Sequence, residues 1–337
     1  MKNSDLLCIR ADASRGVGTG HVMRCLALAQ SWQDQGGSAV FVYHEMPENL
    51  TARLAAEGMQ SRRLTAPLSE IEEFLRVVSE LSAAWVVLDG YLFPPSYHAA
   101  LRSQGFKVLC IDDMAHLKTY HVDLVLNQNL SAQASDYDGK TMSGTHLLLG
   151  PQFSLLRREF SLAAGQPRQR STPPRRLLVS FGGSDLENLS TQVLAKLATE
   201  PCQTLEVRLL VGATNPRLEE LADLVQNLPY RAELIANTQQ VAAHMDWADG
   251  AVSAAGSTVW ELCCMRVPSL LMATSPDQLK VFPFLGAVGL FQLIDATCLP
   301  RLEIMASLQK LGANVAEAPA WMDAKGASRV VEKLRAL

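Results

Sequence analysis

Short apolar runs rich in β-branched residues alternate along the chain with longer segments whose apolar residues recur with the period of a helix. This alternation is typical of βα units arranged around parallel sheets, and it constrains the fold more than any other feature of the sequence. In the first half the predicted strands are Leu6–Arg10, Ala39–Tyr43, Trp85–Asp89, Lys107–Ile111, Val122–Leu126 and Leu147–Leu149, and the predicted helices are His21–Gln33, Asn49–Ala56, Glu70–Leu81 and Pro95–Ser103.

The alternation is interrupted at GQPRQRSTPPRR (Gly165–Arg176), where proline, glycine and charge replace periodic apolar residues, as in a linker. We therefore expect an α/β protein with two Rossmann-like domains facing each other across a cleft: residues 1–165, a linker at 166–176, and residues 177–337. Asp323–Leu337 resembles a closing amphipathic helix, which could pack back on the N-terminal domain. In the second half the predicted strands are Leu177–Phe181, Glu206–Val211, Glu233–Ile235, Gly250–Ser253 and Ser269–Met272, and the predicted helices are Leu189–Leu197, Pro216–Gln226, Gln239–Trp247 and one from Thr258.

Composition and charge exclude several classes of function. With 30 Lys+Arg against 34 Asp+Glu, the formal net charge is -4, which gives no reason to expect nucleic acid as a partner. No apolar run approaches the ~20 residues that span a bilayer, and the N-terminal segment does not resemble a signal peptide. The seven cysteines form no C-x-x-C pair, and the histidines form no H-E-x-x-H motif. We expect a cytoplasmic protein with reduced thiols, no metal and no cofactor; its oligomeric state leaves no trace in the sequence.

The loops that follow strands are the candidate sites, because ligands of parallel α/β sheets bind at the carboxyl ends of the strands. The first such loop, RADASRGVGTGH (Arg10–His21), has glycines at alternate positions that let the backbone approach a ligand, although turn glycines are the alternative. Its G-x-G-x-G-H spacing differs from the G-x-G-x-x-G of dinucleotide sites. His21, at a helix start, suits a general base. One turn later, Arg24 could pair with an acidic ligand, with Asp12 or with solvent.

Two loops of the second half have glycines and hydroxyls before a helix. The loop SFGGSDLENLS (Ser180–Ser190) could form a phosphate cradle. The simpler alternative is a helix capped by Ser184 or Asp185, and the two interpretations are compatible. In SAAGSTVWEL (Ser253–Leu262), Glu261 could accept hydrogen bonds from ribose hydroxyls, or simply favour the helix N-terminus. No Gly-Lys-Ser/Thr follows, so ATP hydrolysis is not expected.

Acidic residues end two strands of the first half. Asp89 precedes Tyr91 after one predicted strand, and Asp112-Asp113 follows the next. Paired aspartates can bind a metal or act as acid and base, but at a strand end they are as often a cap or a turn.

These motifs in their order resemble the UDP-sugar hydrolases of pseudaminic acid biosynthesis, a family similar to the glycosyltransferase of lipid II synthesis and of the same GT-B fold. The resemblance covers most of the chain. It is carried by IRADASRGVGTGHVMRCLALA (Ile9–Ala29), VVLDGY (Val86–Tyr91), DDMAHLKTYHVDLVLNQNL (Asp112–Leu130), GPQFSLLRREF (Gly150–Phe160), VSFGGSDLENLS (Val179–Ser190) and SAAGSTVWEL (Ser253–Leu262).

The resemblance implies that water attacks the anomeric carbon of UDP-2,4-diacetamido-2,4,6-trideoxy-β-L-altropyranose and releases UDP with inversion, in polysaccharide biosynthesis and flagellin glycosylation. The partners would be this UDP-sugar and UDP, with two helix N-termini stabilising the leaving pyrophosphate without a metal. The expected catalytic residues are His21 and Tyr91. The expected substrate-binding residues are Arg10, Asp12, Gly18, Gly20, Arg24, Asp277 and Gln278, and the expected nucleotide-binding residues are Gly182, Gly183, Ser184, Asn188, Gly256, Ser257, Thr258 and Glu261.

The chain departs from the family pattern at three places. Gly90 stands where the family often has His, Asp277-Gln278 stands where it has Asn-Gln, and Tyr91–Tyr97 (YLFPPSY) differs from the usual segment. An acid in place of an amide changes charge and donor capacity. Two alternatives therefore stay open: a GT-B glycosyltransferase with a UDP-sugar donor, and a nucleotide-sugar-binding protein with impaired catalysis.

Overall fold

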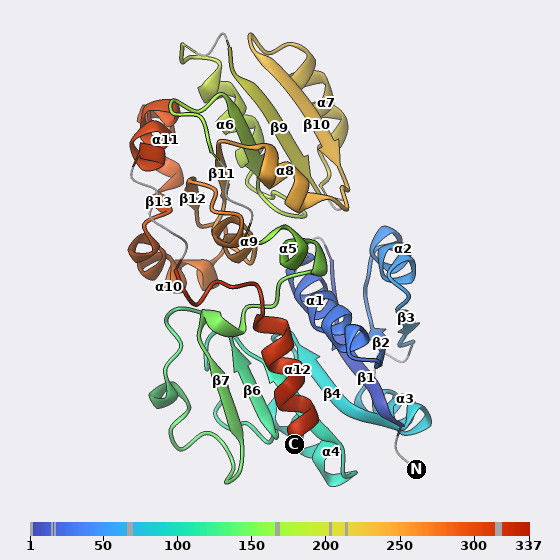
Figure 1. Cartoon of the computed structure of the whole chain (residues 1–337). Coiled ribbons are helices and arrows are strands. Elements are labelled where there is room, and N and C mark those ends of the chain that lie inside the picture. Colours follow the sequence, from blue (N-terminus) through green and yellow to red (C-terminus); the bar gives the residue numbers. More distant parts are fainter. Residues whose placement is uncertain are drawn as a thin grey trace. The chain divides into compact units, whose positions relative to one another are not determined.

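A computed structural model describes residues 3–14, 16, 18–65, 70–165, 169–201, 204–212, 215–313 and 319–337. The chain forms two compact units, which we call the N-terminal unit (Met1–Arg158 with Lys325–Leu337) and the C-terminal unit (Glu159–Ala324). Each unit is a parallel sheet with helices against it (Figure 1). The predicted α/β class is therefore confirmed.

The N-terminal unit has a seven-stranded parallel sheet in the order β3-β2-β1-β4-β5-β6-β7. The order reverses between β1 and β4, and such a switch point is where ligands of open α/β sheets bind. The strands are β1 (Asn3–Ala11), β2 (Ser38–Tyr43), β3 (Gln60–Arg63), β4 (Ala83–Asp89), β5 (Lys107–Ile111), β6 (Leu124–Asn127) and β7 (His146–Leu149). The helices are α1 (Gly20–Asp34), α2 (Glu48–Ala56), α3 (Glu70–Leu81), α4 (Pro95–Ser103) and α12 (Gly326–Ala336), with short 3-10 turns at Ala134–Tyr137 and Pro151–Phe153.

Successive residues of β1 point to opposite faces of this sheet, as the period of a strand requires. Leu7 and Ile9 pack in the core shared with α1 and α12, whereas Leu6 and Cys8 pack in the core shared with α3 and α4. Because both faces of the sheet are buried, the sequences of these strands are nearly continuous apolar runs.

The C-terminal unit has a six-stranded parallel sheet in the order β10-β9-β8-β11-β12-β13, with its own switch point between β8 and β11. The strands are β8 (Arg176–Ser180), β9 (Glu206–Val211), β10 (Arg231–Ala236), β11 (Gly250–Ala254), β12 (Ser269–Met272) and β13 (Phe291–Ile294). The helices are α5 (Arg158–Ala163), α6 (Leu189–Leu197), α7 (Leu218–Gln226), α8 (Val241–Trp247), α9 (Thr258–Cys264), α10 (Pro276–Leu285) and α11 (Ile304–Ala313), with 3-10 turns at Gly286–Val288 and Ala296–Arg301.

The boundary between the two compact units lies before the expected linker. The chain passes from one unit to the other at Arg158, before the expected linker, and its last helix belongs to the N-terminal unit. The segment after Arg158 is tied to the C-terminal unit: Glu159 accepts the Ala242 N–H at 3.1 Å, and the Asp249 carboxylate accepts the N–H groups of Ser171, Arg175 and Arg176, each at 3.0 Å. The described part of the proline-rich stretch, from 169 to 176, is therefore anchored rather than a free spacer.

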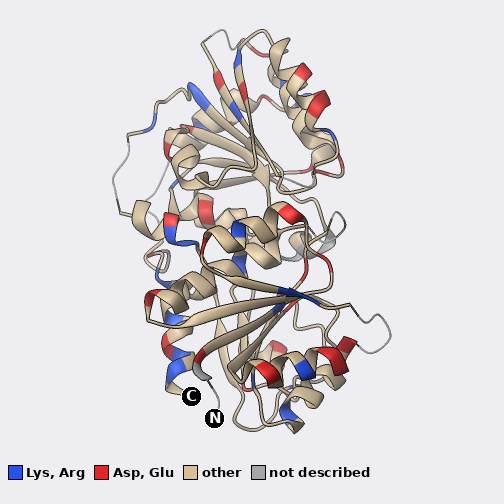
Figure 2. Cartoon of the chain, turned by 90° about the vertical axis from the view of Figure 1, so that its right-hand side faces the viewer, with Lys and Arg blue, Asp and Glu red and all other residues tan. Residues whose placement is uncertain are grey.

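The charges of the chain are of both signs throughout. Figure 2 shows acidic and basic residues interspersed along helices and strands of the viewed side. Among the helices of the described residues, none is long and apolar enough to cross a membrane.

Candidate active site

The switch point of the N-terminal sheet brings three loops to one edge. Ala11 of β1 pairs with Asp89 of β4, and Asp89 pairs with Ile111 of β5, so the loops that follow these strands leave the sheet side by side. These loops carry the glycine-rich segment before α1, Gly90-Tyr91, and Asp112-Asp113. The sequence marked all three as candidates without predicting that they meet.

The glycine loop begins α1 at Gly20 and places His21 in the first turn of that helix. Gly18 has φ +77° and donates its N–H to the Ser14 carbonyl at 2.8 Å. A Cβ on Gly18 would meet no atom within 4 Å, so this position requires glycine for its backbone conformation and not for a close approach.

A second glycine directs the chain after β4. Gly90 has φ +146°, which L side chains rarely adopt, and a Cβ there would lie 3.3 Å from Cε2 of Phe93. The turn presents Tyr91, whose ring meets His21 edge to face at 5.5 Å and His116 edge to face at 5.7 Å between centroids. A His side chain at position 90 would be strained in this backbone conformation. His116 was not among the predicted site residues, although it lies in the segment Asp112–Leu130 that carries the resemblance.

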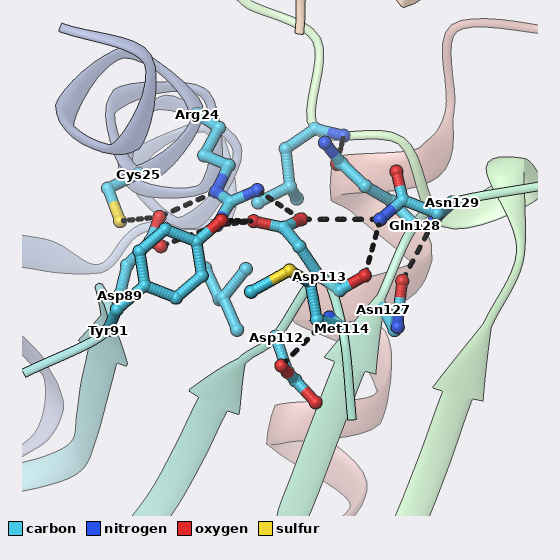
Figure 3. Close-up of polar contacts among 12 residues, drawn as sticks. Arg24, Cys25, Asp89, Tyr91, Asp112, Asp113, Met114, Asn127, Gln128 and Asn129 are labelled. Carbon is cyan, nitrogen blue, oxygen red and sulfur yellow. Dashed lines mark hydrogen bonds and ion pairs between the residues drawn. The ribbon is translucent and has the colours of Figure 1, made fainter. Parts of the chain in front are cut away.

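Arg24 lies at the centre of the site, between two aspartates (Figure 3). Its Nε and Nη2 donate to the Asp89 carboxylate at 2.7 and 2.6 Å, and its Nη1 and Nη2 donate to Asp113 at 2.8 and 2.9 Å. The side chain is 7% exposed. The partners of Arg24 are thus the buried Asp89, which ends β4, and the partly buried Asp113, which follows β5, instead of the Asp12 or solvent considered from the sequence.

Asp113 collects further contacts. Its Oδ2 accepts the Tyr91 hydroxyl at 3.2 Å, and Asn129 Nδ2 donates to its backbone carbonyl at 3.1 Å (Figure 3). Burial alone would raise the pKa of Asp113, but the Arg24 guanidinium, with smaller contributions from His21 and the Tyr91 hydroxyl, lowers the pKa below its usual value. Asp113 is therefore ionised at neutral pH.

The neighbouring Asp112 has a structural role. Its carboxylate accepts the N–H groups of Met114 and Ala115 at 3.1 and 3.0 Å, and the hydroxyls of Tyr120 and Tyr137 at 2.7 and 2.9 Å. The pair that looked alike in sequence thus divides into one aspartate that closes a turn and one that faces Tyr91. Among the described residues, no group of three or more His, Cys, Asp or Glu could hold a metal ion.

Arg10 and Asp12, both expected to bind substrate, are engaged with each other. Arg10 Nη1 lies 2.6 Å from Asp12, and its Nε and Nη2 donate to Glu70 at 3.0 and 2.7 Å. Asp12 also accepts the N–H groups of His44 and Glu45 at 2.6 and 3.0 Å. With Arg10 1% exposed, this cluster stabilises the end of β1; contact with substrate stays a prediction.

In the C-terminal unit, the two loops expected to bind nucleotide also meet at a switch point, because Ser180 of β8 pairs with Ser253 of β11. Gly182 in the first loop has φ +77°. A Cβ on Gly212, which follows β9, would lie 2.5 Å from the Gly183 Cα, so the two chain segments approach closely. Ser184 follows this turn and is half-buried.

The backbone N–H groups at the start of α6 are hydrogen-bonded to a carboxylate of the chain itself. The Asp185 carboxylate accepts the N–H groups of Leu189 and Ser190 at 2.8 and 3.0 Å, and Asn188 precedes the helix with φ +54°. The capped helix considered for this loop is thus observed, with Asp185 as the capping side chain. A phosphate at these amides would face that carboxylate.

The second loop contacts one of the residues expected to face the sugar. A Cβ on Gly256 would lie 3.3 Å from Gln278 Nε2, while Gln278 Oε1 accepts the N–H and hydroxyl of Thr274 at 2.9 and 3.2 Å. Ser257 precedes α9, Thr258 begins it, and Glu261 lies in its first turn. Asp277 belongs to α10, and its side chain lies outside the described residues.

Two proteins whose names specify UDP-sugars are similar in sequence to this chain. The chain is 25% identical over 263 residues to a UDP-2,4-diacetamido-2,4,6-trideoxy-β-L-altropyranose hydrolase of Campylobacter jejuni, covering 76% of this chain and 87% of that protein. It is 25% identical over 344 residues to a UDP-N-acetylglucosamine–N-acetylmuramyl-(pentapeptide) pyrophosphoryl-undecaprenol N-acetylglucosamine transferase of Carboxydothermus hydrogenoformans, covering 89% and 91%. No family model matches the chain.

Among solved structures, S. aureus MnaA in complex with UDP matches with a TM-score of 0.67 and 13% identity, covering 98% of this chain and 96% of that one. This likeness concerns the fold alone. The resemblance to UDP-sugar hydrolases and the GT-B type of fold, both expected from the motifs, are confirmed.

Proposed function

We propose that this protein is a hydrolase that releases UDP from a UDP-activated diacetamido-trideoxy sugar. The observation that carries the proposal is the cluster at the N-terminal switch point, where His21 lies against Tyr91 beside the ionised Asp113. The sequence similarity to a hydrolase of such a sugar supports the same reaction. The cytoplasmic location and the place in pseudaminic acid biosynthesis belong to this proposal.

The chemistry follows from the groups present. His21 accepts a proton from water as the water oxygen bonds to the anomeric carbon. The bond from that carbon to the β-phosphate oxygen breaks, and its electron pair leaves on UDP. Attack from the face opposite UDP gives inversion. A positioned general base of this kind contributes about 10²- to 10⁴-fold to the rate.

We assign the nucleotide to the C-terminal unit. The turn at Gly182–Ser184 and the hydroxyls of Ser257 and Thr258 offer hydrogen-bond donors to phosphate oxygens, and Glu261 offers a carboxylate to the ribose. The amides at the start of α6 are left out of this assignment because Asp185 occupies them.

The reaction is tested by incubating the protein with the UDP-sugar in H₂¹⁸O and following UDP by ³¹P NMR. We expect UDP release without an acceptor, with ¹⁸O found in the sugar and absent from UDP, because the C–O bond breaks. His21→Ala should lower kcat by about 100-fold or more. His146→Ala is the matched control, since His146 begins β7 at the other end of the strands.

Three outcomes would contradict the proposal. UDP release that requires an acceptor would favour a glycosyltransferase, the activity of the Carboxydothermus relative. Tight UDP binding without turnover would favour a nucleotide-sugar-binding protein. Unchanged kcat in His21→Ala would exclude this histidine as the base.

A further inference from the structure

We infer that Asp113 is a positioning residue that fixes the hydrogen-bond direction of Tyr91, so that the Tyr91 oxygen acts as an acceptor toward the ligand. The inference rests on the proposed function, and it concerns a residue for which a cap or a turn was as frequent an interpretation as an acid or base.

The Asp113 carboxylate cannot rotate freely, because Arg24 holds both of its oxygens. Nη1 of Arg24 donates to Oδ1 at 2.8 Å and Nη2 donates to Oδ2 at 2.9 Å. Arg24 is itself held from the other side by Asp89, at 2.7 and 2.6 Å. Such paired guanidinium–carboxylate contacts fix geometry as well as charge. The orientation of Oδ2 is therefore set by residues of α1 and β4.

That fixed Oδ2 receives the Tyr91 proton at 3.2 Å. An ionised carboxylate can only accept, so the phenol must donate to it. The contacts of the Tyr91 ring with His21 and His116 hold the plane of the phenol. With its proton directed to Asp113, the Tyr91 oxygen can offer a lone pair to an O–H or N–H of a ligand.

An acceptor next to a general base suits the attack of water. Water has two protons, and in this arrangement one is donated to His21 and the other to Tyr91. The two contacts fix the orientation of the two lone pairs on the water oxygen, and one of these lone pairs forms the bond to the anomeric carbon. Only the proton on His21 is transferred; the proton shared with Tyr91 stays on the oxygen and becomes part of the sugar hydroxyl.

Asp113→Asn is expected to reverse this direction. An asparagine has a single acceptor oxygen, and the Arg24 donors require it, which turns the amide NH₂ toward Tyr91. The phenol oxygen then receives a hydrogen bond from Asn and directs its own proton at the ligand. The fold should survive, because Arg24 and Asp89 still form a pair of opposite charges.

The test is a double-mutant cycle on turnover with Asp113→Asn and Tyr91→Phe. We expect each single variant to lower kcat by about 10- to 100-fold, the range of a hydrogen bond to a charged group, with KM changed much less. The double variant should lose little more than either single one, because both remove the same acceptor. Tyr120→Phe is the matched control: it removes a phenol from the neighbouring Asp112 at 2.7 Å, and it should lower the Tm while leaving kcat unchanged.

The possible failures are distinguishable. If the wild type releases UDP and the losses in kcat multiply in the double variant, Asp113 and Tyr91 act independently and the inference is overturned. The same follows if Asp113→Asn changes only the Tm, as Tyr120→Phe should. Absence of turnover in the wild type overturns the proposed function, and this inference with it.

Discussion

His98 shows how a single buried side chain can set the acid sensitivity of the protein. It lies in α4 with 0% exposure, and among the described residues neither ring nitrogen has a hydrogen-bond partner. Burial, helped by His121 and opposed by Asp112, lowers its pKa to about 4. Because the folded state disfavours the charged ring, the unfolded state binds the proton first as the pH falls. Stability is therefore lost progressively from about pH 6.5 down to about pH 4.

Replacing His98 by an apolar residue should reduce this loss of stability at acid pH. In His98→Leu we expect the decrease in unfolding free energy between pH 7 and pH 5 to be smaller than in the wild type by about 2 kcal/mol, from ~1.4 kcal/mol per unit of pKa difference. Urea unfolding at both pH values measures it, with His146→Leu as the control. An unchanged pH dependence in His98→Leu would show that other groups govern acid unfolding.

At the scale of elements, the apolar pattern of the sequence predicted those strands and helices whose side chains are largely buried. The strands Ala39–Tyr43 and Lys107–Ile111 were predicted within one residue of β2 and β5. The edge strand β3 was missed because its residues are QSRR, which carry no apolar alternation. β6 begins at Leu124, two residues later than predicted, because Asp123 accepts the Val108 N–H at 2.8 Å through its side chain.

The site required information that pattern does not contain. The sequence identified the loops after three strands, but it did not show that β1 and β4 are neighbours. That adjacency brings Arg24 of α1 to Asp89 and Asp113. Likewise, nothing in Asp112-Asp113 indicates which aspartate closes the turn, since this depends on the distant Tyr120 and Tyr137.

The N-terminus of α6 gives a prediction at the same scale. Asp185 is 6% exposed and satisfies two helix amides that would otherwise be unpaired. Asp185→Ala should lower the unfolding free energy by about 1–2 kcal/mol, the typical cost of losing a helix cap. Glu187→Ala, two residues further in the exposed part of the loop, should change it by less than about 0.5 kcal/mol. Equal effects of the two substitutions in chemical denaturation would contradict the capping role.

At the scale of the whole molecule, the N-terminal unit is built from two segments that are far apart in the sequence. The N-terminal unit ends at Arg158 and is resumed at Lys325. The sequence predicted a closing amphipathic helix and allowed its return, but an apolar face alone does not say which core it covers. In the structure, α12 contacts the N-terminal unit at two places. Trp85 Nε1 donates to the Leu334 carbonyl at 3.0 Å, and a Cβ on Gly326 would lie 2.2 Å from the Ser154 carbonyl oxygen.

We therefore expect α12 to contribute to the stability of the N-terminal unit. Leu334 is 2% exposed within the core that also contains residues of α1, β1 and β4. Leu334→Ala should lower the unfolding free energy of the N-terminal unit by about 2–5 kcal/mol, because it leaves a cavity in that core. Hydrogen exchange should then accelerate in α1 and β4 and stay unchanged in β8, β9 and β11, whereas the exposed Glu332→Ala on the same helix should alter neither. If hydrogen exchange instead became faster only in the C-terminal sheet, α12 would stabilise the C-terminal unit, which precedes it in sequence. That result would contradict the assignment of α12 to the N-terminal unit.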